Sequence, residues 1–236
     1  MARVLVVHYS RSGHTARLAR MLAEEMRSCG HEVTNEAIRA ECEWNKWLLP
    51  VPLLPLLPAL PLYLASSRFR RIWQRHYFQP RQAIRPLVND DVSGFDLVLL
   101  GTPKWLYLSY PVARWLDAVG GLEGRQVACF ATFCGPPLKV FEIDMLFTPL
   151  EAALRSRGAF PAGRLAISSD HHEYFFFNEM RGLFRWLSHR VFGRRLADFT
   201  LDGVVGRREA ARFCRQCCEA LRNLEADSSR PRNSLV

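Results

Sequence analysis

Three hydroxyl side chains stand close together in a short polar turn near the start of the chain. They belong to Ser10, Ser12 and Thr15. Gly13 lies between the last two, and a glycine lets a ligand approach the backbone closely. Hydroxyl groups donate hydrogen bonds to phosphate oxygens, and the free N–H groups at the start of a helix attract anions. The spacing therefore predicts a phosphate-binding turn, provided that a helix follows it.

Two better known phosphate loops are absent, and one simpler interpretation stays open. The turn has no Gly-Lys-Ser/Thr sequence of a nucleotide-binding P-loop, and no Gly-x-Gly-x-x-Gly of a dinucleotide-binding fold. Serine and threonine also cap helices without binding any ligand. We favour phosphate binding over simple capping because three hydroxyls share one turn between a strand and a helix.

The segments on both sides of the turn have the patterns that such a site needs. Residues 3–8 form a short apolar run typical of a buried strand. The helix that follows repeats apolar residues on one face and ends at Cys29-Gly30. Residues 31–38 predict a second strand, which completes a β-α-β unit with parallel strands.

Strands and helices go on alternating along the chain, which predicts a doubly wound α/β fold with a five-stranded parallel sheet. The remaining strands are expected at residues 95–101, 125–132 and 164–168, and the remaining helices at 111–119, 144–157 and 207–224. We expect one domain over residues 1–225, with insertions at about 41–90 and 169–203 and a flexible tail at 226–236.

The turn resembles the FMN phosphate loop of the flavodoxin family, which has the pattern T/S-x-T/S-G-x-T. Residues 96–105 resemble that family's third strand with the loop beside the flavin ring, and residues 129–135 its fourth strand with the second ring loop. The resemblance covers residues 1–40, 95–168 and 205–224. It implies a flavodoxin-like sheet of order 2-1-3-4-5, with the ligand at the switch point between strands one and three.

The resemblance also implies the cofactor, FMN, and the residues that surround it. Trp105 or Tyr107 would stack on one face of the flavin ring, and the second ring loop would line its other side. It gives no catalytic residue and no metal ligand. The expected cofactor-binding residues are Ser10, Arg11, Ser12, Gly13, His14, Thr15, Pro103, Lys104, Trp105, Leu106, Tyr107, Thr132, Phe133, Cys134 and Gly135.

The net charge of +9 is concentrated in the two insertions. Residues 68–86 carry six arginines and residues 181–195 carry five, without an acid in either, so the rest of the chain has a net charge of −2. Both segments also contain aromatic residues. An uncharged stretch at 47–64 holds five prolines, which forbid a membrane-spanning helix. Arginines mixed with aromatics on an amphipathic helix predict contact with an anionic membrane through residues 47–86 and 174–195, or else a lid over the cofactor.

Other residue clusters indicate less chemistry. Asp170 and His171 are candidate catalytic residues by their position after the last strand alone. Cys214, Cys217 and Cys218 share one helical face, which favours a buried core over a redox or metal site. No recognition motif accompanies the arginines, so we expect no nucleic-acid partner. The few cysteines and the lack of a signal-like start predict a cytoplasmic protein, at most peripheral on the inner face of the membrane.

Three functions fit these observations. The first is an FMN-dependent oxidoreductase that takes electrons from NAD(P)H or a reductase and passes them to a quinone-like or other apolar acceptor. The second comes from a similarity of residues 105–111, and of Asp170, Asn178 and the Arg185-Trp186-Leu187 segment, to flavodoxin-like proteins known as dialkylresorcinol condensing enzymes. These act on long-chain acyl precursors, and Cys134 would be the nucleophile. The third is a non-catalytic module that binds flavin or another anion.

Overall fold

The computed structural model describes residues 1–41, 61–62, 64–69, 83–104, 108–169 and 175–228. For residues 140–142, 175–181 and 224–228 it describes the backbone alone. A five-stranded parallel sheet of order β2-β1-β3-β4-β5 forms its centre. This is the flavodoxin-like order, so the predicted fold class is confirmed. The strands are β1 (Arg3–His8), β2 (Glu32–Ala37), β3 (Leu97–Pro103), β4 (Gln126–Cys134) and β5 (Phe160–Ser169).

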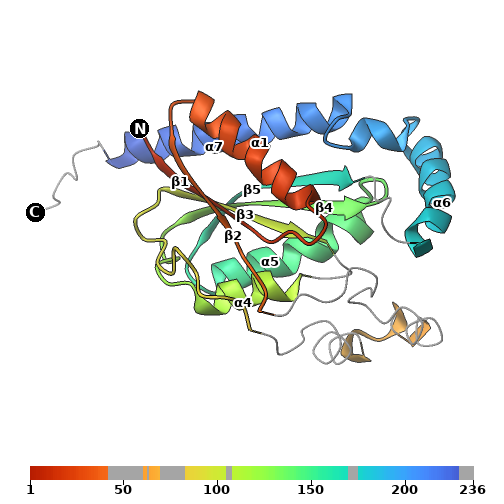
Figure 1. The fold of residues 1–236 in the computed structure, drawn as a ribbon, viewed down its shortest axis with the longest axis horizontal. Helices are drawn as coiled ribbons and strands as arrows, with labels where there is room; N and C mark the ends of the chain where they lie inside the picture. The colour runs from red at the N-terminus through yellow and green to blue at the C-terminus, as the bar shows by residue number, and fades with distance from the viewer. Residues whose placement is uncertain (42–60, 63, 70–82, 105–107, 170–174, 229–236) are drawn as a thin grey trace, which may run out of the picture.

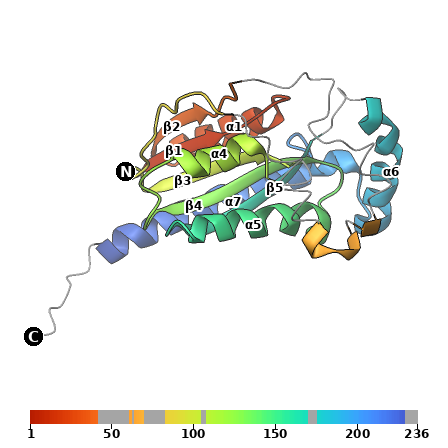
Figure 2. The same cartoon turned by 90° about the horizontal axis from the view of Figure 1, so that it is seen from below.

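Helices cover both faces of the sheet (Figure 1). α1 and α7 lie on one face, and α4 and α5 lie on the other, as the view from below also shows (Figure 2). α6 stands beyond the end of the sheet toward which β4 and β5 point. The helices are α1 (His14–Ser28), α4 (Tyr110–Ala118), α5 (Met145–Arg155), α6 (Phe175–Phe192) and α7 (Val204–Ser228), with short turns η2 (Lys139–Asp144) and η3 (Leu196–Phe199).

The two layers of helices explain why the strands are apolar on both faces. Alternate residues of β1 point to opposite sides: Val4 and Val6 join the core under α1 and α7, whereas Leu5 and Val7 join the core under α4 and α5. Trp115 is the largest fully buried side chain of the second core. Burial of both faces fixes the strand register, and with it the position of every loop at the strand ends.

The last strand is longer than the sequence predicted. The sequence pattern predicts a strand at residues 164–168, since Pro161 and Gly163 both argue against a strand. In the structure the strand begins at Phe160. β5 is the outermost strand of the sheet, and a proline is tolerated where one side of the strand has no partner. A register shift between Val127 and Ala128 of β4 accommodates this irregular start.

Two helix ends also differ from the prediction. α7 begins at Val204 rather than at 207 and continues to Ser228, into the expected tail. Gly206 lies inside the first turn of α7, where a side chain would collide with the backbone oxygen of Thr200. This glycine therefore lets the start of α7 pack closely against the residues that precede it. A helical turn, η2, precedes α5 and was not predicted. The early insertion lies mostly outside the described residues, whereas the later one contains α6 and η3.

Candidate functional site

The predicted phosphate turn lies between β1 and α1, at the carboxyl edge of the sheet. The backbone N–H of Tyr9 donates to the carbonyl of Gly101, 3.0 Å away, which ties the start of the turn to β3. From β1 the sheet continues to β2 on one side and to β3 on the other. The turn therefore sits at the switch point of the sheet, where ligands of open α/β folds bind.

The first turn of α1 is open and electropositive. Gly13 caps the helix with φ 88° and ψ −15°, a left-handed conformation that favours glycine, and no side chain hydrogen-bonds to the cap. The first turn contains no acidic residue. An added Cβ at Gly13 would meet no atom within 4 Å. No hydroxyl of the turn therefore caps the helix with its side chain, and the space beside Gly13 is open.

The hydroxyls of the turn have different surroundings. The Ser10 hydroxyl oxygen is buried and has no hydrogen-bond partner among the described residues. A buried polar atom in that state is costly, and an anionic ligand would satisfy it. Thr15 is buried, and its hydroxyl lies 2.8 Å from the hydroxyl of Thr132 at the end of β4. Ser12 is half-buried at the same edge. Thr15 thus joins the helix to β4, and its role as a phosphate ligand stays a prediction.

The loop after β3 starts beside the phosphate turn. The backbone N–H of Lys104 donates to the carbonyl of Thr132, 2.8 Å away, so the ends of β3 and β4 are held together. The Thr102 and Ser109 hydroxyls lie 3.0 Å apart and close the base of the loop. Pro103 and Lys104 are thus at the expected edge. The predicted ring contacts of Trp105, Leu106 and Tyr107 lie outside the described residues.

The loop after β4 completes the same edge of the sheet. The Ser169 hydroxyl donates to the carbonyl of Phe133 at 3.0 Å, and that of Ser168 donates to the carbonyl of Gly135 at 2.7 Å. The side chain of Phe133 is only 2% exposed, so it offers a ligand its backbone rather than its ring. Cys134 is half-buried, and its role as a nucleophile stays a prediction.

An aromatic ring that the sequence did not assign to the site covers this loop. The ring of Phe184, on α6, would lie 3.3 Å from a Cβ placed on Gly135. α6 therefore contacts the second ring loop directly. The sequence indicated this contact only through the aromatic residues of the insertion at 169–203. That content does not identify the residue that contacts the loop. Asp170 and His171, the catalytic candidates next to it in sequence, lie outside the described residues.

A cavity of about 310 Å³ with a mixed polar and apolar lining adjoins the phosphate turn. His14 and Thr132 line it on one side, and Ser168 and Thr200 line it on another. Its rim holds an ion pair in which both terminal guanidinium nitrogens of Arg17 donate to the carboxylate of Asp202, at 2.8 and 2.5 Å. This pair connects α1 to the segment before α7.

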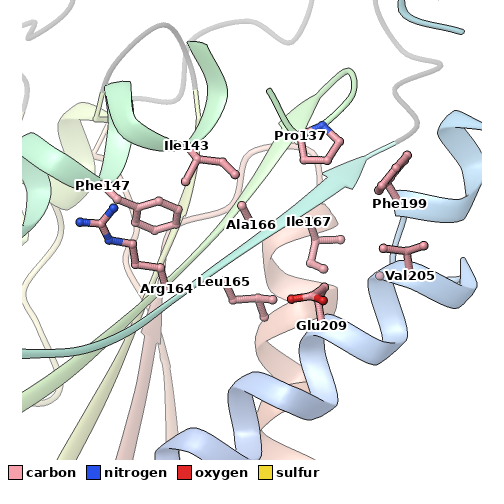
Figure 3. A pocket seen from close by; sticks show the side chains of 11 residues that line it. Pro137, Ile143, Phe147, Arg164, Leu165, Ala166, Ile167, Phe199, Val205 and Glu209 are labelled. Atoms are coloured by element: carbon pink, nitrogen blue, oxygen red, sulfur yellow. The ribbon is translucent and has the colours of Figure 1, made fainter. Parts of the chain in front are cut away.

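A second cavity, of about 350 Å³, lies at the outer edge of β5 (Figure 3). Its lining is mostly apolar, with Phe147 on one side and Val205 on the other. Arg164 lies within it, held by the buried carboxylate of Glu151, whose pKa is lowered by hydrogen bonds from this guanidinium. Because β3 and β4 lie between β5 and β1, this cavity is not part of the site at the switch point.

Thiols and metal-binding groups add little to the site. Cys214, Cys217 and Cys218 are buried in the core under α1 and α7, as predicted. Burial raises the pKa of Cys214 to about 12 and that of Cys218 to about 11, so both thiols stay protonated near neutral pH. Within the described ranges, no group of three or more His, Cys, Asp or Glu side chains is placed to hold a metal ion. None of the helices described there is long and apolar enough to cross a membrane.

His8 is a buried titratable group at the end of β1. Burial and the charge of Arg20 together lower its pKa from 6.5 to about 4, against hydrogen bonds with the Asn35 side chain and the Glu36 backbone that raise it. A histidine with a lowered pKa binds fewer protons folded than unfolded. The protein should therefore lose stability as the pH falls from 6.5 to about 4, by up to about 3 kcal/mol from this residue.

Replacing His8 by glutamine removes this titration and should flatten the dependence of stability on pH. We expect urea unfolding of the wild-type protein to show a steeper loss of stability between pH 6.5 and about pH 4 than unfolding of His8→Gln. Carboxylates titrate in both proteins, so the difference between the two curves isolates His8. Parallel curves would show that His8 is protonated equally in both states.

A curated protein is similar in sequence to part of this chain. A curated NAD(P)H dehydrogenase (quinone) from Methylocella silvestris is 30% identical over 126 residues, which make up 53% of this chain and 50% of that protein. The match thus spans about half the length of that relative. No family model matches the chain.

Solved structures resemble this chain at low sequence identity. A candidate flavoprotein from Bacteroides eggerthii is 22% identical, with a TM-score of 0.46, over 70% of this chain and 88% of that one. A flavoprotein in complex with FMN from Lactobacillus acidophilus is 18% identical, with a TM-score of 0.42, over 70% and 93%. The fold assignment rests on the strand order of this chain itself.

Proposed function

We propose that this protein is an FMN-dependent oxidoreductase that accepts electrons from NAD(P)H and reduces a quinone-like or other apolar acceptor. The observation that carries the proposal is the turn between β1 and α1. It combines an uncapped helix start, an open glycine and a buried Ser10 hydroxyl without a partner among the described residues. Each of these features suits a phosphate group at the switch point of the sheet.

The residues of the turn have distinct tasks in this proposal. The hydroxyls of Ser10 and Ser12 and the backbone N–H groups after Gly13 would bind the phosphate of FMN. Thr15 holds α1 against β4 through Thr132, which keeps these donors in place. The bound cofactor would supply the two-electron chemistry that side chains lack.

The rest of the carboxyl edge would position the flavin ring. The backbone of Cys134 and Gly135 follows β4 at this edge, and the Phe184 ring contacts Gly135 from α6. The ring of Phe184 at this place would shield the flavin ring from water and offer an apolar acceptor a surface to contact. The nicotinamide donor and the quinone acceptor are suggested by the Methylocella silvestris relative, which matches over half of its length.

The function is tested by purifying the chain, adding FMN, removing excess cofactor and recording the flavin absorbance. A yellow protein that oxidises NADH or NADPH only when a soluble quinone is present supports the proposal. A yellow protein without this activity supports the non-catalytic module. A protein that stays colourless after reconstitution overturns the oxidoreductase and the flavin-binding module, and leaves only a module that binds another anion.

A further inference from the structure

The helix α6 has one face against the protein and one face that is exposed in the described part of the chain. Phe184 lies against Gly135, and the Ser188 hydroxyl is buried and donates to the carbonyl of Arg194 at 2.9 Å. Phe192 contacts Phe199 edge-on, with ring centroids 5.2 Å apart. These contacts recur every four residues, so they fix the rotation of the helix about its own axis.

The opposite face exposes large apolar side chains. Leu183 is 48% exposed and Trp186 is 61% exposed, and their spacing of three residues places them side by side on the helix. Val191, 53% exposed, lies on the flank of the helix, five residues after Trp186. A tryptophan this exposed has an apolar ring and a polar N–H, the combination found at membrane–water interfaces.

Exposed arginines lie beside these apolar side chains, on α6 and in the turn after it, while the one acid of α6, Glu179, lies near its start. Arg185, Arg190 and Arg194 are exposed, and none of them forms an ion pair with a described residue. Residues 181–195 contain no acid at all. Some exposed arginines elsewhere are paired, as Arg17 is with Asp202 and Arg157 is with Asp117, whereas others, such as Arg215 and Arg222 of α7, form no ion pair with a described residue. An anionic surface would complement the positive charge of these exposed arginines.

We propose that the outer face of α6 docks on the surface of an anionic phospholipid bilayer. The arginines would contact lipid phosphates while Trp186 and Leu183 enter the headgroup region, as in other amphipathic helices that lie in the membrane plane. A bilayer offers phosphates to the arginines and an apolar interior to Leu183 and Trp186. A nucleic acid or an acidic protein surface would neutralise the arginines but leave Leu183 and Trp186 without an apolar surface to contact.

Docking through α6 would place the carboxyl edge of the sheet at the membrane. α6 stands at that edge in both views (Figures 1 and 2) and contacts the loop after β4 through Phe184. An apolar acceptor dissolved in the bilayer would then reach the proposed flavin site without crossing water. The docking itself does not depend on the cofactor, so it goes beyond the proposed function and is testable without it.

The test is co-sedimentation of the purified full-length chain with lipid vesicles. Vesicles of phosphatidylglycerol mixed with phosphatidylcholine are compared with vesicles of phosphatidylcholine alone, at low and at high salt. We expect the protein to sediment with the anionic vesicles and to stay in the supernatant with the neutral ones. Salt should weaken binding without abolishing it, because screening acts on the arginines and not on the inserted apolar side chains.

Variants locate the binding face. Arg185→Glu, Arg190→Glu and Arg194→Glu together should weaken binding by more than about a hundredfold, since each basic residue near an anionic surface contributes about a fivefold factor. Trp186→Ala should make the remaining binding fully sensitive to salt. The matched control carries the same charge change at three exposed arginines of α7: Arg212, Arg215 and Arg222. Circular dichroism confirms that each variant is folded.

Several outcomes would overturn the proposal. The first is a protein that stays in the supernatant with anionic vesicles at low salt. Equal loss of binding in the α7 control would show nonspecific attraction to positive charge, and binding to heparin without binding to vesicles would show a polyanionic partner of another kind. The Ser12→Asp variant, expected to lack flavin, should still sediment, so failure of the cofactor assignment is distinguishable from failure of docking.

Discussion

Replacing Ser12 by aspartate is expected to remove flavin binding almost completely. Ser12 stands in the turn before α1, where the open helix start and the Ser10 hydroxyl face the proposed phosphate. The change removes a hydroxyl donor, and a hydrogen bond to a charged group is worth about 1.5–3 kcal/mol. It also puts a carboxylate against a phosphate, which adds repulsion. A loss of at least about 3 kcal/mol corresponds to more than a hundredfold weaker binding.

Titration of the flavin-free protein with FMN, followed by quenching of flavin fluorescence, measures the change. The matched control is Ser156→Asp, which adds the same charge at an exposed serine after α5, at the opposite edge of the sheet. The control should bind FMN as the wild-type protein does. Equal affinity of the Ser12→Asp variant and the wild type would show that the phosphate does not bind in this turn.

Local patterns were enough to predict the strands of the sheet and the polar turn that follows the first of them. The apolar run of β1 and the polar turn that follows it each depend on residues next to one another in sequence. The strand order came from the resemblance, and the sheet confirms it. The start of β5 was missed because Pro161 is read locally as a strand breaker, whereas its effect depends on β5 being an edge strand.

The contacts that shape the site join residues far apart in sequence. Thr15 and Thr132 are 117 positions apart, so no local pattern indicates that their hydroxyls meet. The placement of Phe184 over Gly135 is of the same kind. Local sequence determines which elements form, but side-chain packing between elements determines which groups of a turn are free to bind a ligand and which hold the fold together.

Replacing Gly101 by alanine is expected to destabilise the fold strongly. Gly101 lies in β3 between His8 of β1 and Phe130 of β4. A Cβ at this position would overlap the Phe130 ring and come within 2.8 Å of the Cβ of His8. The Phe130 ring is fully buried, so it has no free space to move into. Overpacking of this kind costs about 3 kcal/mol, at the upper end of its usual range.

Urea unfolding of the wild type and four variants separates the cost of the clash from the general cost of replacing a glycine. Gly163→Ala is the control, because a Cβ there would lie 3.4 Å from the nearest atom, on Phe213, at ordinary contact distance. This control should change stability by less than about 1 kcal/mol. Combining Gly101→Ala with Phe130→Leu should cost less than the sum of the two single changes by at least about 1 kcal/mol, because the smaller side chain removes the clash.

Additive costs in that double variant would show that the Phe130 ring does not limit the space at Gly101. The same close approach also bears on the site, because the carbonyl of Gly101 accepts the hydrogen bond of Tyr9 that anchors the phosphate turn. A β3 strand displaced at Gly101 would carry that anchor with it. The Gly101→Ala protein should therefore bind FMN more weakly even under conditions where it remains folded, whereas Gly163→Ala should bind it unchanged.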